Sequence, residues 1–198
     1  MAIKKQVETK FKFWTPLRIV STLIVLGLLA AFGVSSCNSN DPPIRVSNPN
    51  LPIVPSVVLD TEMKAANGSP IKLSNYSGKV MLVNLWATWC GPCRMETPEL
   101  VRLHKEYRDR GVEFVGLSTE DPMSSAQKVQ EFMQQYDVGY HIGWATRDVA
   151  LALMQGNTSI PQSFIITRDG RIHKRIRGFH PVRTPPELKE ALEGALGS

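Results

Sequence analysis

The stretch that most constrains the fold lies between residues 79 and 111, where an apolar run passes through two cysteines into a helical pattern. Residues 79–87 (KVMLVNLWA) are almost entirely apolar, which is typical of a strand covered on both faces. After Cys90-Gly-Pro-Cys93, apolar side chains recur three and four residues apart until Gly111 ends the pattern, at Leu100, Leu103 and Tyr107. A buried strand followed directly by a helix predicts an α/β fold.

The rest of the chain continues this alternation. Further strands are predicted at residues 112–118, 163–167 and 171–178, and further helices at 123–136, 147–155 and 186–196. Asp169-Gly170 predicts the turn of a hairpin between the last two strands. Residues 56–60 and 69–73 are predicted to pair as an N-terminal β-hairpin. We therefore expect a central mixed sheet flanked by helices, with an N-terminal β-hairpin extension.

Length and composition divide the chain into a leader, a linker and one domain. A chain of 198 residues, of which 42% are hydrophobic, is long enough for one well-cored domain, which we place at residues 56–198. Residues 37–55 form a linker rich in proline and asparagine, without helical or strand periodicity. Such a segment predicts an extended spacer.

Residues 1–36 have the parts of a secretory signal peptide, namely a cationic stretch followed by an apolar run. The run from Ile19 to Val34 would be about 24 Å long as a helix, shorter than the roughly 30 Å of a bilayer core. This length favours a removed signal, with an N-terminal membrane anchor as the alternative. Five basic residues and only one acidic residue lie in 1–37, so the net charge of +5 belongs mainly to the leader. No nucleic-acid partner is expected.

Cys37 closes a short motif, Val34-Ser-Ser-Cys37, that resembles the lipobox of bacterial lipoproteins. The resemblance implies that Cys37 carries a diacylglycerol and becomes the first residue of the mature chain. The alternative is an unmodified thiol next to an uncleaved anchor. Both alternatives place the domain outside the cytoplasm, tethered to the bacterial cytoplasmic membrane through lipid or a helix.

The cysteine pair has several possible uses. Haem attachment requires a histidine after the second cysteine, where this chain has Arg94. A zinc site requires two more ligands, and the four histidines are scattered without ligand spacing: His104, His141, His173 and His180. We expect no metal and no cofactor other than the redox-active disulfide Cys90–Cys93. A static disulfide remains an alternative outside the cytoplasm.

Disulfide exchange fits this position in the chain best. At the start of a helix, unpaired N–H groups and the helix dipole stabilise a thiolate on the first cysteine. Cys90 is then the nucleophile, and Cys93 is the thiol that resolves the mixed disulfide. Gly91 permits a tight entry, and Pro92 needs no N–H partner in the first helical turn.

The Trp89-Cys-Gly-Pro-Cys93 motif resembles the thioredoxin active site. Together with the leader and residues 159–172 (SIPQSFIITRDGRI), it resembles the TlpA/ResA-like branch of the thioredoxin family over about residues 56–196. The resemblance implies a thioredoxin-like fold and an extracytoplasmic thiol:disulfide oxidoreductase acting on disulfide-containing protein substrates. It further implies a reductase supplied by a membrane thiol donor, with a role in cytochrome c maturation. We expect a monomer.

Carried over to this chain, the resemblance makes Ile160-Pro161 a cis peptide bond that faces the cysteines, with the Ile160 backbone pairing with substrate. The residues expected to bind substrate are Trp89, Gly91, Pro92, Ile160 and Pro161. Trp89 is expected to line the docking surface, whereas Trp86 is expected in the core.

Asn84 stands where cytosolic thioredoxins have a buried aspartate, and the TlpA/ResA-like branch instead uses a glutamate that corresponds to Glu96. Glu96 lies three residues after Cys93, on the same helix face, and is expected to accept its proton. The alternative is a solvated glutamate that only complements the helix dipole.

Two other function classes remain open. A peroxiredoxin-like peroxidase needs a proline at a fixed distance before its cysteine, in a region that Val83 and Asn84 occupy here. A non-catalytic metal- or protein-binding module, such as a metallochaperone, would retain metal and would not reduce disulfides.

Overall fold

The structure, a computed structural model of the chain, describes residues 48–198. The predicted signal peptide, Cys37 and the first part of the predicted linker lie outside the described residues. None of the helices in the described part is long and apolar enough to cross a membrane.

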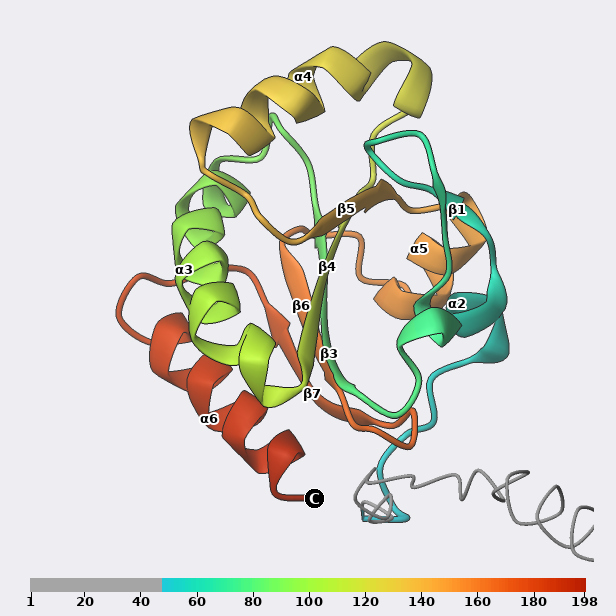
Figure 1. Cartoon of the computed structure of the whole chain (residues 1–198), viewed down its shortest axis with the longest axis vertical. Helices are drawn as coiled ribbons and strands as arrows, with labels where there is room; N and C mark the ends of the chain where they lie inside the picture. Colours follow the sequence, from blue (N-terminus) through green and yellow to red (C-terminus); the bar gives the residue numbers. More distant parts are fainter. Residues whose placement is uncertain (1–47) are drawn as a thin grey trace, which may run out of the picture. The chain divides into compact units, whose positions relative to one another are not determined.

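The predicted central mixed sheet is confirmed (Figure 1). Its five strands lie in the order β5-β4-β3-β6-β7. The strand β3 pairs in parallel with β4, which pairs in parallel with β5, whereas β6 is antiparallel to both β3 and β7. The bounds are β3 Val80–Trp86, β4 Val112–Ser118, β5 His141–Trp144, β6 Gln162–Ile166 and β7 Ile172–Arg177.

Helices cover both faces of this sheet (Figure 1). The core on one face holds apolar side chains of α3, α4 and α6, and the core on the other face holds those of α2 and α5. All seven residues of β3 are buried, because this strand has a neighbour on each side and a helical layer over each face. The helices are α2 Ser56–Asp60, α3 Gly91–Tyr107, α4 Pro122–Gln135, α5 Arg147–Met154 and α6 Thr184–Leu196, with 3-10 turns at Leu73–Tyr76 and Arg108–Arg110.

The N-terminal hairpin is present, but its first arm differs from the prediction. Residues 56–60 form the short helix α2, and the hairpin pairs β1 (Met63–Lys64) with β2 (Pro70–Ile71). The two valines of the stretch resemble a strand in the sequence. In the structure they belong to a helical turn, which buries Val58 and leaves Val57 exposed.

The strand β5 was not predicted. It has only four residues, and Gly143 interrupts its apolar pattern. Gly143 is needed because the hairpin crosses β5 here: Ala65 bridges Gly143, and a Cβ atom on Gly143 would lie 3.0 Å from the carbonyl oxygen of Lys64. Gly143 therefore weakens the strand pattern in the sequence, and it also lets the hairpin approach the sheet closely.

The described end of the predicted linker, residues 48–55, packs against the domain. Ile53 bridges Arg171 next to the β6–β7 turn, and the Val54 N–H donates to the carbonyl of Gly170 at 2.9 Å. The Arg171 guanidinium donates to the carbonyls of Pro49 and Leu51 at 3.0 and 2.9 Å. Val54 is only 1% exposed. This part of the chain is thus not a free spacer.

Candidate active site

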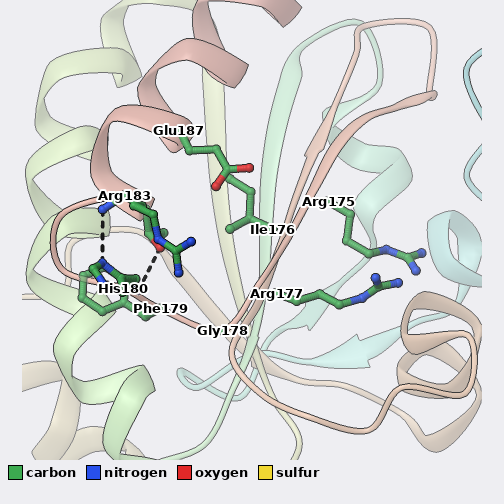
Figure 2. A pocket seen from close by; sticks show the side chains of 9 residues that line it. Arg175, Ile176, Arg177, Gly178, Phe179, His180, Arg183 and Glu187 are labelled. Carbon is green, nitrogen blue, oxygen red and sulfur yellow. Dashed lines mark hydrogen bonds between the residues drawn. The ribbon is translucent and has the colours of Figure 1, made fainter.

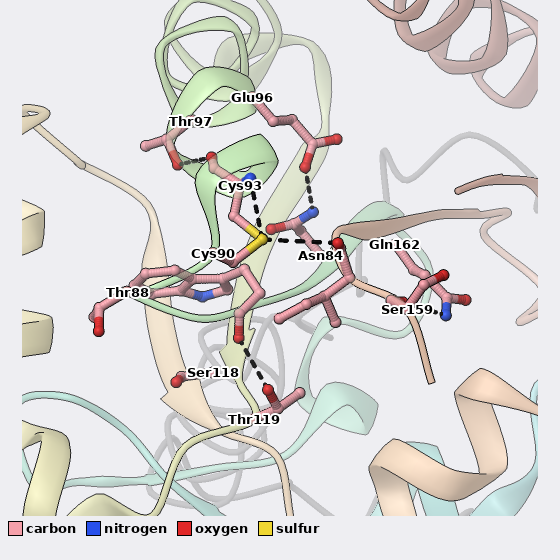
Figure 3. The surroundings of a disulfide bond; sticks show 12 residues. Asn84, Thr88, Cys90, Cys93, Glu96, Thr97, Ser118, Thr119, Ser159 and Gln162 are labelled. Carbon is pink, nitrogen blue, oxygen red and sulfur yellow. Dashed lines mark hydrogen bonds between the residues drawn. A yellow bond between two sulfur atoms is a disulfide. The ribbon is translucent and has the colours of Figure 1, made fainter. Parts of the chain in front are cut away.

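The two cysteines lie where β3 ends and α3 begins, and they form a disulfide (Figure 3). Cys90 occupies the position immediately before the first helical residue, and its Sγ accepts a hydrogen bond from the Cys93 N–H at 3.2 Å. A donor of the first helical turn therefore points at the sulfur that we expect to react. Cys90 and Cys93 are 4% and 1% exposed, so only small parts of either residue reach the surface.

The expected cis peptide bond between Ile160 and Pro161 is present, in the loop before β6. The carbonyl oxygen of Ile160 lies 3.7 Å from Cys90 Sγ. Gln162, which the sequence analysis did not single out, is fully buried and donates to the carbonyls of Asn157 and Ser159 at 2.7 and 2.8 Å. Gln162 therefore holds the loop that carries Ile160.

Glu96, on the buried face of α3, belongs to a small polar cluster. It is 1% exposed, and it accepts hydrogen bonds from Asn84 Nδ2 at 2.9 Å and from Ser163 Oγ at 3.0 Å. Asn84 Nδ2 also lies 2.9 Å from Ser163 Oγ. Burial raises the pKa of Glu96 to about 7, although the hydrogen bonds from Ser163 and Asn84 act in the opposite direction. Glu96 is thus not a solvated residue of the first helical turn.

Ser163 was missed because its link to Glu96 depends on strand pairing. Asn84 and Ser163 are directly opposite each other in the antiparallel pair β3–β6, although 79 residues separate them in sequence. Asn84 itself was noted only as a replacement for an acid. In the structure its amide nitrogen donates to Glu96 Oε2 and to Ser163 Oγ, and so positions the Glu96 carboxyl group.

A second polar contact holds the turn before Cys90. The carboxylate of Glu120, in the loop after β4, accepts hydrogen bonds from the Thr88 N–H at 2.8 Å and from Thr88 Oγ1 at 2.7 Å. Ser118 Oγ donates to the same carboxylate at 3.1 Å. Glu120 carries no motif signal in the sequence, and its partner lies 32 residues away.

Trp89 is 71% exposed and stands at the surface beside Cys90, whereas Trp86 is buried in the core as expected. A groove of about 530 Å³ runs from Trp89 to Ile160 and is lined on its far side by Leu151 and Met154 of α5. Gly91 and Pro92 are exposed at the start of α3. Of the residues expected to bind substrate, Trp89 and Ile160 thus line one groove, whereas Pro161, which follows Ile160 in the chain, is buried.

The histidines do not gather near the cysteines. Within residues 48–198, no three or more side chains of His, Cys, Asp or Glu are grouped so that they could hold a metal ion. His104, for example, packs between the rings of Phe114 and Tyr140.

Comparisons with known proteins agree with this geometry. The redoxin family matches residues 50–192, a range that contains the disulfide and the cis-proline loop. The chain is 31% identical to the thiol-disulfide oxidoreductase ResA of Bacillus thuringiensis subsp. konkukian over 137 residues, covering 69% of this chain and 72% of the relative. It is 28% identical to ResA of Geobacillus thermodenitrificans over 176 residues, covering 88% and 94%.

Among solved structures, the fold is similar to that of a thiol:disulfide interchange protein of the thioredoxin family from Chlorobium tepidum TLS. The identity is 28% and the TM-score is 0.64, and the match covers 76% of this chain and 100% of the other.

Proposed function

Because the chain belongs to the redoxin family and is a ResA-like thiol–disulfide oxidoreductase of thioredoxin fold, we propose that it reduces protein disulfides outside the cytoplasm. The observation that best supports disulfide exchange is the placement of Cys90 Sγ. This atom accepts the Cys93 N–H at the start of α3 and lies 3.7 Å from the carbonyl oxygen of Ile160.

The reaction starts from the reduced pair. The Cys90 thiolate attacks one sulfur of the substrate disulfide, so that a Cys90–substrate disulfide forms and the other substrate sulfur leaves as a thiolate. Cys93 then attacks Cys90 Sγ, which releases the second substrate sulfur and forms the Cys90–Cys93 disulfide. Two electrons pass from the protein to the substrate, and the protein must be reduced again by another dithiol.

Cys93 must lose a proton before it can attack. Glu96 is the buried carboxyl group nearest in sequence on the same helix face, and its pKa of about 7 suits a group that takes and returns a proton at neutral pH. Glu96 thus serves as proton acceptor for Cys93, directly or through a water molecule.

The reducing direction, the membrane thiol donor and the role in cytochrome c maturation are proposed from the resemblance to the TlpA/ResA-like branch. The Gly-Pro pair between the cysteines is that of reducing thioredoxins, whose potential is about −270 mV.

The proposed place of action depends on the leader. The lipobox-like motif before Cys37 supports a lipid anchor on the outer face of the cytoplasmic membrane. Mass spectrometry of the mature N-terminus should find Cys37 acylated and first in the chain, whereas an intact Met1 or Ala2 would contradict the lipid anchor.

A redox titration of the Cys90–Cys93 pair, combined with its redox state in cells, tests the direction. We expect a potential near that of thioredoxin and a pair that is mostly reduced in cells. A pair that is mostly oxidised in cells would show that the protein acts as an oxidase.

A further inference from the structure

A second groove, of about 420 Å³, runs along β7 and the loop that leads into α6 (Figure 2). Within residues 48–198, β7 is the last strand of the sheet. On its outer edge the Ile172 N–H donates to the carbonyl of Pro52, and no other strand in the described part of the chain pairs with the rest of that edge. The groove is lined by charged or titratable residues on β7 and around the start of α6, namely Arg175, Arg177, His180, Arg183 and Glu187. It is therefore a basic groove with one acidic residue.

The positive charges of this groove are not neutralised by the protein itself. Among residues 48–198, the side chains of Arg175, Arg177 and Arg183 form no ion pair and no hydrogen bond, whereas Glu187 is already paired with Lys174 at 3.1 Å. The guanidinium of Arg175 lies over the Phe164 ring, and its Nε is buried without a partner. Burial, followed by the charge of Arg177, lowers the pKa of Arg175. An anion in the groove would relieve this repulsion.

The start of α6 is not the source of this site. The N–H groups of Val182 and Arg183 donate to Nδ1 of His180 at 3.2 and 3.4 Å. The backbone donors that precede the helix are therefore already used within the loop. The anion-binding capacity rests on the three arginines.

The arginines lie on both sides of β7. Figure 2 shows Arg175 and Arg177 extending from one side of the strand, as residues two positions apart should, and Arg183 with α6 on the other side. An extended chain placed along the edge would alternate its side chains between these two sides. Acidic residues at successive positions would thus meet a guanidinium group on either side.

The groove begins next to the reacting sulfur. The N–H of Gly178, where β7 ends, donates to the carbonyl of Pro161 at 2.8 Å. The preceding carbonyl, that of Ile160, lies 3.7 Å from Cys90 Sγ. A substrate chain held at Ile160 needs to continue by only a few residues to enter the groove.

We propose that this groove binds an acidic, extended segment of the protein substrate, next to the disulfide that Cys90 attacks. The inference rests on the proposed disulfide exchange and adds a substrate class to it. The competing explanation is that the charges only protect a free sheet edge from pairing with other chains.

The test uses three peptides that share one internal disulfide and differ only in four flanking residues on each side, which are glutamate, glutamine or lysine. The full chain, reduced beforehand and held in detergent, is mixed with each peptide. The second-order rate of its oxidation is followed by acid quench and mass analysis. This single turnover does not depend on any electron donor.

We expect the glutamate peptide to react about 3- to 10-fold faster than the glutamine peptide, and the lysine peptide to be slowest. The preference should fall in high salt, because the charges are exposed and screened. Arg177→Gln combined with Arg183→Gln removes two of the three arginines and should bring the ratio of the glutamate rate to the glutamine rate close to one. The matched control, Lys64→Gln combined with Lys128→Gln, removes the same charge from exposed sites elsewhere and should retain that ratio.

The acidic-segment proposal would be overturned if wild type reacted with all three peptides at equal rates, or if the lysine control lost the preference for the glutamate peptide as much as the arginine variant does. The arginines would then only protect the sheet edge. A reduced wild-type protein that fails to reduce even the glutamine peptide would instead contradict the proposed reductase.

Discussion

At the scale of single residues, the site depends on one buried carboxyl group and its two donors. Asn84 and Ser163 both hydrogen-bond to Glu96, so the carboxyl group is held in place without a second negative charge beside it. A second carboxylate at position 84 would repel the ionised form of Glu96. The amide therefore leaves burial as the main influence on the pKa of Glu96.

The pKa of Glu96 predicts how stability depends on pH. The folded state raises this pKa from 4.5 to about 7, so the folded protein binds the proton more tightly than the unfolded chain does. The resulting stabilisation is complete below pH 4.5 and is lost as the pH rises through 7. It amounts to about 3 kcal/mol. Glu96→Gln has no group at this position that titrates. In urea unfolding of the oxidised proteins, its free energy of unfolding should therefore rise relative to that of wild type by up to about 3 kcal/mol between pH 5 and pH 8.

Glu190→Gln, at an exposed position, serves as the control and should follow the pH dependence of wild type. A stability difference between Glu96→Gln and wild type that stays constant with pH would contradict the raised pKa. Glu96→Gln should also release substrate from the mixed disulfide about 100-fold more slowly than wild type, because Cys93 would lack its proton acceptor. Unchanged release would remove Glu96 from the proton transfer.

At the scale of elements, the long and strongly patterned segments could be predicted from the sequence. These include β3, β4, α3 and α4, whose ends differ from the predictions by at most a few residues. The short elements could not be predicted in this way. The strand β5 has four residues with a glycine inside, and α2 has five residues, two of which are valines. Their conformations depend on what packs against them.

The site shows the same division. Cys90, Cys93 and Ile160-Pro161 stand in a local motif or a family pattern, and the sequence predicted that they would meet. Ser163 and Glu120 act through partners that are distant in sequence, and only the strand register and the loop packing reveal them.

The N-terminal segment before α2 is predicted to contribute to stability. A chain that begins at Ser56 loses the buried Val54 and the carbonyls that bind Arg171. Compared with a chain that begins at Asn48, its free energy of unfolding should be lower by at least about 2 kcal/mol, as measured in urea. Ile53→Ala in the longer chain is the control, because Ile53 is 66% exposed and should change the stability by less than about 0.5 kcal/mol. Equal stabilities of the two chains would show that the segment contributes nothing.

At the scale of the whole described domain, the reacting groups meet at one end of the sheet. The parallel strands β3 and β4 deliver the Cys90 turn and the Glu120 loop to this end, and the antiparallel strand β6 starts there with Pro161. An apolar groove from Trp89 to α5 and a basic groove along β7 both reach the Ile160-Pro161 loop. In our proposal, a protein substrate would be held on both sides of its disulfide.

The most direct test of disulfide exchange at Cys90 is to trap the mixed disulfide. Cys93→Ser and Cys90→Ser, each reduced, are mixed with native insulin, whose disulfides are intact, and analysed by mass spectrometry under non-reducing conditions. Cys93→Ser is predicted to accumulate an adduct in which Cys90 is joined to an insulin chain, because the resolving thiol of Cys93 is absent. Cys90→Ser should accumulate less, since Cys93 is the more deeply buried of the two and it is Cys90 Sγ that lies against the Ile160 carbonyl. An adduct formed through Cys93, or no adduct with either variant, would contradict the assignment of Cys90 as the attacking thiol.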